Sequence, residues 1–268
     1  MDIPLFPNIL NYGLNSFEHV SARIDSIPSR DREWEKVPVL VNDVNYIQFL
    51  MNICKISSIE VILYLNDYYL DNEFKNQFYD NLVRLEEEYV GVAGDVRFNS
   101  LTLYVCCRAF KPDIVVETGV AAGKSSAIIL LALHHNKKGK LYSIDKPNFK
   151  GELIEDNAHT TTRNLDVGWV VPNYLRSKWT LELGDSLQLL PIIIDRAEGL
   201  IDIFFHDSLH TKDHVCGELE IIDKSLTPNS LILVDDIDTG AGVAFSEYLA
   251  KKKNAGFAYR EMAGARFC

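Results

Sequence analysis

The chain has 268 residues, of which 47% are hydrophobic and 24% charged, a composition typical of an ordinary globular protein. Its net charge of -11 argues against general nucleic-acid binding, which depends on neutralising phosphates. The sequence shows no signal-peptide pattern and no apolar run of membrane-span length, so we expect no membrane association. Five cysteines without zinc-ligand spacing favour a reducing compartment, and we therefore expect a cytoplasmic protein.

The first part of the chain predicts an extension made mostly of helices. Residues 1–42 hold four prolines and little periodicity, which indicates an irregular arm with a short helix near 17–24. Residues 42–89 have helical periodicity, and Asp43 is the expected cap of the first helix there. A glycine-containing break follows. We therefore divide the chain into an extension, residues 1–94, which forms a lid or an oligomer contact, and a second domain, residues 95–268.

The second domain alternates apolar strands with helices, which is typical of the α/β class. Strands are predicted at 114–117, 140–145, 179–183, 201–205 and 230–234. Helices are predicted at 99–110, 125–135, 212–226 and 241–252. Residues 257–262 and 265–268 predict a closing hairpin that turns at Gly264. The long connection 147–177 is of a length that usually has a function or some helix of its own.

One stretch organises this domain, the run VVETGVAAGKSS at 115–126. Its glycines allow a sharp turn and a close approach of the backbone to a ligand. The helix that follows presents free N–H groups to polar or negative ligand groups. Asp145 ends the next strand, where a carboxylate can accept hydrogen bonds from a ribose diol. The pattern therefore predicts a site for a nucleoside-containing cofactor.

Two alternative cofactor loops fit this stretch less well. A phosphate-binding P-loop needs four residues between its glycines, whereas three separate Gly119 from Gly123. A dinucleotide loop has the pattern G-x-G-x-x-G, and Ala121 stands where its second glycine belongs. A turn that binds no cofactor is the third possibility.

The spacing Glu117-x-Gly119-x-Ala121-x-Gly123 resembles the first motif of class I S-adenosylmethionine (SAM) methyltransferases. In that family the acidic residue faces the methionine amino group, and the glycines pass beneath the cofactor. A residue like Asp185 lies beside the adenine in such enzymes, and a helix cap at Asp185 or Ser186 is the alternative role, which is compatible with the first. The resemblance implies a SAM site formed by Glu117, Thr118, Gly119, Ala121, Gly123, Ser125, Asp145, Gly184, Asp185, Ser186 and Asp207.

The ordered set VVETGVAAGKSS, GKLYSID, VGWVVP, WTLELGDS, DIFFHDSLHT and LILVDDID is similar to a bacterial group that includes macrolide-sugar and aminocoumarin O-methyltransferases, the methyltransferase-24 group. The similarity covers roughly residues 95–268. It implies a Rossmann-like, doubly wound sheet of seven strands in the order 3-2-1-4-5-7-6, with the last strand antiparallel. The N-terminal helical extension is not explained by it.

The chemistry is expected at the ends of the fourth and fifth strands. Asp207, Asp235 and Asp236 could hold Mg²⁺, which would orient a hydroxyl and lower its pKa. The sugar enzymes carry an acidic base two places after the first of these, where this chain has Leu209 and then His210. We therefore predict Asp207 and His210 as catalytic residues, with His210 as the base. Simple helix capping and lining of the cofactor pocket are the alternatives for the carboxylates. We expect His206 to point into the core, and Asp213 and His214 to face solvent.

Taken together, the patterns predict a SAM-dependent O-methyltransferase that acts on a small-molecule hydroxyl, such as a sugar or a natural product. A metal-free N-methyltransferase and a non-catalytic SAM-binding scaffold are the alternatives. The expected partners are a small-molecule acceptor and further copies of the chain in a homo-oligomer.

Overall fold

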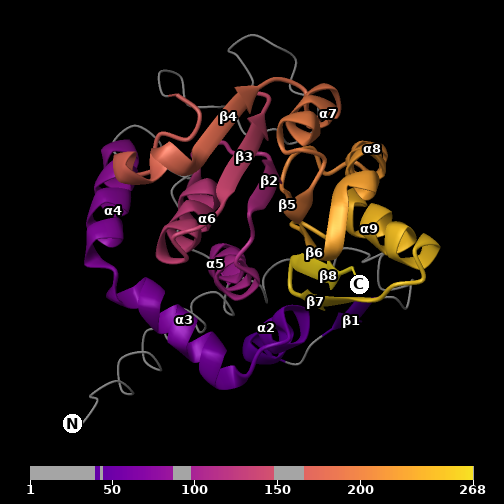
Figure 1. Cartoon of the computed structure of the whole chain (residues 1–268), viewed down its shortest axis with the longest axis horizontal. Helices are drawn as coiled ribbons and strands as arrows, with labels where there is room; N and C mark the ends of the chain where they lie inside the picture. The colour runs from indigo at the N-terminus through magenta and orange to yellow at the C-terminus, as the bar shows by residue number, and fades with distance from the viewer. Residues whose placement is uncertain (1–39, 43–44, 87–97, 148–165, 268) are drawn as a thin grey trace.

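The computed structural model describes residues 40–42, 45–86, 98–147 and 166–267. They form one eight-stranded sheet in the order β1-β7-β8-β6-β5-β2-β3-β4 (Figure 1). The strands are β1 (Leu40–Asn42), β2 (Ile114–Thr118), β3 (Lys140–Asp145), β4 (Trp179–Leu183), β5 (Ile201–His206), β6 (Leu226–Val234), β7 (Gly256–Tyr259) and β8 (Met262–Arg266).

The predicted topology is confirmed. Strands β2 to β6 run parallel to one another, and β8 is antiparallel to both β6 and β7. Without β1, the strand order is the predicted 3-2-1-4-5-7-6. The additional strand β1 pairs in parallel with β7 and lies within the segment that we predicted as irregular. Three residues are too few to show a strand period, and the pairing partner lies more than two hundred residues away in sequence.

Helices cover both faces of the sheet (Figure 1). They are α2 (Tyr46–Cys54), α3 (Ser58–Leu70), α4 (Asn72–Glu86), α5 (Phe98–Phe110), α6 (Lys124–His135), α7 (Ser186–Arg196), α8 (Lys212–Ile222) and α9 (Gly240–Lys251), with short 3₁₀ turns η2 (Asn173–Lys178) and η3 (Asp223–Ser225). Helices α2, α3, α5 and α6 share one hydrophobic core with one face of the sheet, and α7, α8 and α9 share a second core with the other face.

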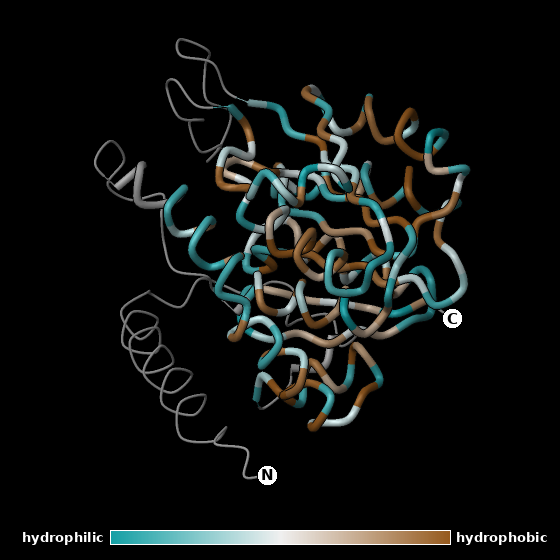
Figure 2. The backbone as a smooth tube through the Cα atoms, turned by 60° about the vertical axis from the view of Figure 1, so that its left-hand side comes forward, coloured by the Kyte–Doolittle hydropathy of each residue, from teal (hydrophilic) through white to brown (hydrophobic). Residues whose placement is uncertain are grey.

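The two cores follow from the alternation of side chains along each strand. Val115 and Phe205 point to the α5–α6 side, while their neighbours Val116 and Phe204 point to the α7–α9 side. Strands buried on both faces require continuous apolar sequence, which is the pattern that predicted them. Figure 2 shows the consequence, with apolar segments gathered inside the molecule and polar ones mostly around them.

The predicted helices of the extension are present, with a different first cap. Asn45 caps α2, because its side chain accepts a hydrogen bond of 2.8 Å from the Gln48 amide. The expected cap, Asp43, lies outside the described residues, as do the expected helix near 17–24 and the glycine break. No single helix in the described part is long and apolar enough to cross a membrane, while the bent pair α2 and α3 meets the test of length and composition alone.

The C-terminal hairpin corrects one prediction. The chain turns between Tyr259 and Met262, whereas Gly264 lies inside β8 and pairs with Leu233. A Cβ at Gly264 would come within 2.8 Å of the Leu233 side chain. The glycine therefore serves close packing within the sheet, and Arg260, at φ 55°, adopts the positive φ of the turn.

Candidate functional site

The loop after β2 is held in a conformation that requires glycine. Gly119 has φ +87°, and a Cβ there would lie 1.8 Å from the backbone oxygen of Asp207. Gly123 has φ +89° and is the N-cap of α6, and its added Cβ would lie 2.7 Å from Gly168 Cα. The loop therefore lies directly against the turn after β5 and against the connection that precedes β4. This close approach explains both glycines, whereas Ala121 is accommodated at φ 47°.

Asp145 lies at the end of β3, facing this loop. Its Oδ2 accepts hydrogen bonds from the backbone N–H groups of Val120, at 2.7 Å, and Ala121, at 2.8 Å. Among the described residues, its Oδ1 takes part in no hydrogen bond. The carboxylate thus fixes the loop with one oxygen and leaves the other for a ligand, which is consistent with the predicted contact to a ribose.

Glu117 is fully buried beneath the same loop. Its Oε2 accepts from the hydroxyls of Ser126, at 2.5 Å, and Ser143, at 2.6 Å, while its Oε1 is buried with no hydrogen-bond partner in the part of the chain that the structure describes. Burial raises the pKa of Glu117, although Ser125, Ser126 and Ser143 act in the opposite direction. A buried oxygen without a donor is costly, and a ligand ammonium group would supply that donor. The arrangement fits the amino group of SAM.

The turn after β4 comes next to Asp145. The backbone N–H of Gly184, at φ +154°, donates to the Asp145 carbonyl at 2.8 Å. Asp185 caps α7, since its side chain accepts from the Leu187 amide at 3.0 Å. The predicted helix cap is confirmed, and the contact of Asp185 with adenine stays a prediction.

Two predicted cofactor residues point elsewhere. The hydroxyls of Thr118 and Ser186 donate to Glu218, a buried residue of α8 on the other face of the sheet. Thr118 and Ser186 are themselves buried, so their side chains do not line the cofactor loop. The predicted burial of His206 is confirmed, but the solvent-facing orientation predicted for His214 is wrong. Its Nε2 lies 3.1 Å from Glu218 Oε1.

His210 lies between two carboxylates at the carboxyl edge of the sheet. Its Nε2 is 3.5 Å from Asp207 Oδ1, and its Nδ1 is 3.7 Å from Asp236 Oδ2. Partial burial of its side chain raises the pKa of Asp207, and the negative charge of Asp236 raises it further. Gly119 lies against the backbone of Asp207, so Asp207 and its neighbour His210 adjoin the cofactor loop. The structure therefore brings the predicted base and the predicted cofactor site together.

The three predicted metal ligands do not converge in this arrangement. Asp235 is engaged by Asn99, whose Nδ2 lies 2.6 Å from one carboxylate oxygen and 2.9 Å from the other. Within the described ranges, no group of three or more His, Cys, Asp or Glu side chains is placed to hold a metal ion. The oxygen donors suit Mg²⁺ by chemistry, but their placement does not fit a metal centre.

Asn99 and Glu218 were missed by the sequence reasoning. Asn99 lies in the first turn of α5, where a polar residue attracts no notice. The burial of Glu218 could have been predicted, because it shares one face of α8 with three apolar residues that are also buried, Val215, Leu219 and Ile222. A charged residue within an apolar helix face indicates a buried ionic contact.

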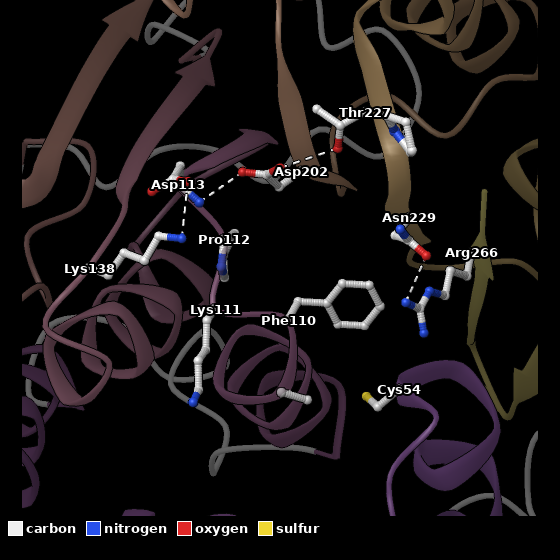
Figure 3. Close-up of a pocket in the computed structure, with 12 residues that line it drawn as sticks. Cys54, Phe110, Lys111, Pro112, Asp113, Lys138, Asp202, Thr227, Asn229 and Arg266 are labelled. Carbon is white, nitrogen blue, oxygen red and sulfur yellow. Dashed lines mark hydrogen bonds and ion pairs between the residues drawn. The ribbon is translucent and has the colours of Figure 1, made fainter. Parts of the chain in front are cut away.

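The structure also contains a cavity of about 300 Å³ at the opposite edge of the sheet (Figure 3). It is lined by residues at the amino ends of β2, β5 and β6, including Asp113, Asp202 and Thr227. Lys138 pairs with Asp113 at 3.0 Å, and Asp202 accepts from two backbone N–H groups. Open α/β folds bind ligands at the carboxyl ends of their strands. None of the predicted site residues lines this cavity, which is therefore separate from the site.

Comparison with known proteins agrees with this geometry. Residues 116–237 match the family model described as a methyltransferase domain, that of the methyltransferase-24 group. The fold is similar to that of the O-methyltransferase TomG from Streptomyces achromogenes, involved in tomaymycin synthesis, which was solved with SAM (TM-score 0.50, 14% identity, 72% of this chain and 90% of that chain).

A second similar structure is cofactor-bound Rv0187 from MTB (TM-score 0.50, 14% identity, 73% of this chain and 90% of that chain). No curated protein matches the sequence. At these identities the solved structures show the fold alone, and the family model matches less than half of the chain. Residues 116–237 are therefore similar to the methyltransferase domain of the methyltransferase-24 group, and the chain has the fold of a methyltransferase that was solved with SAM.

Proposed function

We propose that the enzyme transfers the methyl group of SAM to a hydroxyl oxygen of a small molecule, such as a sugar or a natural product. The observation that carries this proposal is the position of His210, between Asp207 and Asp236 and beside the cofactor loop. A hydroxyl nucleophile must lose a proton during methyl transfer, and a neutral imidazole can accept it. The O-methyltransferase activity of TomG, whose fold is similar, supports the same choice of acceptor.

The residues of the cofactor site have complementary roles in this proposal. Glu117 Oε1 accepts from the methionine amino group, Asp145 Oδ1 accepts from the ribose, and the turn at Asp185 borders the adenine. When bound, SAM supplies an electrophilic methyl group on its sulfonium sulfur. The loop at Gly119 would hold that part of the cofactor beside Asp207, and the acceptor would then lie between the loop and His210.

The proton that the acceptor loses is taken up by a residue of the chain. The acceptor oxygen forms a bond to the methyl carbon, the carbon–sulfur bond breaks, and the hydroxyl proton passes to His210. The carboxylates of Asp207 and Asp236 then face a positively charged imidazolium, which stabilises it. S-adenosylhomocysteine (SAH) leaves as the second product. No step of this route passes through a metal ion, because both oxygens of Asp235 are engaged by Asn99.

The test combines binding with turnover. The wild type is titrated with SAH by calorimetry and is then assayed with SAM against a panel of sugars, phenols and amines. His210→Gln is compared with His134→Gln, which changes an exposed histidine in the last turn of α6. We expect His210→Gln to bind SAH normally and to lose about 10²- to 10⁴-fold in methyl transfer, the usual contribution of a general base.

The other outcomes separate the alternatives. Transfer to amines alone would favour N-methylation, and SAH binding without transfer to any acceptor would favour a scaffold. Full turnover by His210→Gln would show that another group removes the proton. A wild type that does not bind SAH would contradict the proposed function as a whole.

A further inference from the structure

A fully buried carboxylate lies behind the site, on the α7–α9 side of the sheet. Glu218 has no exposed surface, and its two oxygens contact five side chains. Oε2 accepts from Thr118 Oγ1 at 3.0 Å and lies 2.8 Å from His206 Nδ1. Oε1 accepts from the hydroxyls of Ser186 and Ser208, at 2.5 Å and 2.9 Å, and lies 3.1 Å from His214 Nε2.

Four of these partners are sequence neighbours of candidate site residues. Thr118 lies between Glu117 and Gly119, and Ser186 directly follows Asp185. His206 and Ser208 flank Asp207. Because successive side chains at a strand end point to opposite faces, one residue of each turn can face the cofactor while its neighbour faces Glu218. The same carboxylate thus reaches the turns after β2, β4 and β5.

The chemistry of the cluster requires an ionised carboxylate. An ionised carboxylate only accepts hydrogen bonds, and here it meets three hydroxyl donors and two histidine nitrogens. Burial opposes ionisation, but the contact with His206 and the hydrogen bonds lower the pKa of Glu218 well below its usual value. Burial lowers the pKa of His206. A neutral amide at position 218 would keep one acceptor oxygen and place an NH₂ group where the other oxygen stands, so the hydroxyls there would lose their acceptor, and Gln is a poor substitute despite its equal size.

We propose that Glu218 is a positioning residue of the methyl-transfer site, whose single carboxylate fixes the turns after β2, β4 and β5 relative to one another. This inference rests on the proposed function, because its effect is on the groups that hold SAM and the acceptor. Glu218 contacts neither reactant. It acts through the backbone of the residues on either side of its partners.

The first test compares two changes in the same helix. Glu218→Gln preserves size and alters the buried cluster, while Glu220→Gln makes the same chemical change at an exposed position of α8. We expect Glu218→Gln to weaken SAH binding by at least about tenfold, as is usual when hydrogen bonds to a buried charged group are lost. We expect Glu220→Gln to bind SAH as the wild type does.

A second test remains valid if Glu218→Gln does not fold. Thr118→Val and Ser208→Ala each remove one hydroxyl donor from Glu218, and they belong to different turns. If both act through the same carboxylate, their effects on the SAH dissociation constant are not additive in the double variant. Loss of ordinary packing at two separate turns would instead give additive effects on SAH binding.

The outcomes are distinguishable from those of the proposed function. A wild type that fails to bind SAH would overturn the proposed function and this inference together. A wild type that binds SAH, with equal affinity in Glu218→Gln and Glu220→Gln, would overturn this inference alone. Additive effects of Thr118→Val and Ser208→Ala on SAH binding would also overturn it.

Discussion

The contact between Gly119 and Asp207 gives a sharp test of how the cofactor loop is built. Gly119→Ala adds one methyl group at φ +87°, 1.8 Å from the Asp207 carbonyl oxygen and 2.4 Å from its carbonyl carbon. No side-chain rotation relieves this clash, because both atoms belong to the backbone. The loop after β2 and the turn after β5 must therefore move apart, and with them the predicted cofactor site and the predicted catalytic residues.

The size of the effect follows from two contributions. A non-glycine residue in the left-handed region costs about 1–2 kcal/mol. Forcing an additional methyl group into a packed position costs about 1–3 kcal/mol more. The expected loss in the free energy of unfolding is therefore about 2–5 kcal/mol. Because natural domains are stable by about 5–15 kcal/mol, we expect the variant to fold and to be measurable.

Gly199→Ala is the matched control. Gly199 also has a positive φ, +77°, but an added Cβ there would have no atom within 4 Å. Urea denaturation of both variants separates backbone strain from the clash, and calorimetry with SAH reports the effect on the site. We expect Gly119→Ala to be the less stable of the two and to bind SAH weakly, with Gly199→Ala near the wild type in affinity. Equal losses of stability and unchanged SAH binding in both variants would refute the reasoning.

Three further predictions follow from the site. Asp145→Ala should weaken SAH binding by at least about tenfold in calorimetry, because two loop amides lose their acceptor; unchanged affinity would contradict this. Burial raises the pKa of Glu117, so its neutral form favours the folded state, and that stability is lost as pH rises from the ordinary Glu range through the folded pKa. Thermal unfolding across this pH range should show the wild type losing stability relative to Glu117→Gln. Parallel curves of melting temperature against pH for the two proteins would contradict this prediction. Finally, methyl transfer should persist in EDTA; loss restored by Mg²⁺ would reinstate a metal-dependent route through Asp207.

The sequence by itself determined the elements whose signals are local. The buried parallel strands were predicted because both of their faces are covered, which demands continuous apolar runs such as IVV at 114–116 and FF at 204–205. The cofactor loop was predicted because a tight turn needs glycines at fixed spacing, and the structure shows the backbone contact that excludes a side chain at Gly119. Asp145 followed from its place at the end of a strand.

Only the tertiary structure decided which polar groups meet. Thr118 and Glu218 are 100 positions apart, and Asn99 and Asp235 are 136 apart, so no local pattern records either contact. The same holds for β1, which pairs with a strand near the C-terminus. Hydrophobic periodicity indicates that a side chain is buried, but it does not indicate which other side chain it contacts. A buried polar contact depends on the three-dimensional meeting of donors and acceptors, and only the folded chain specifies it.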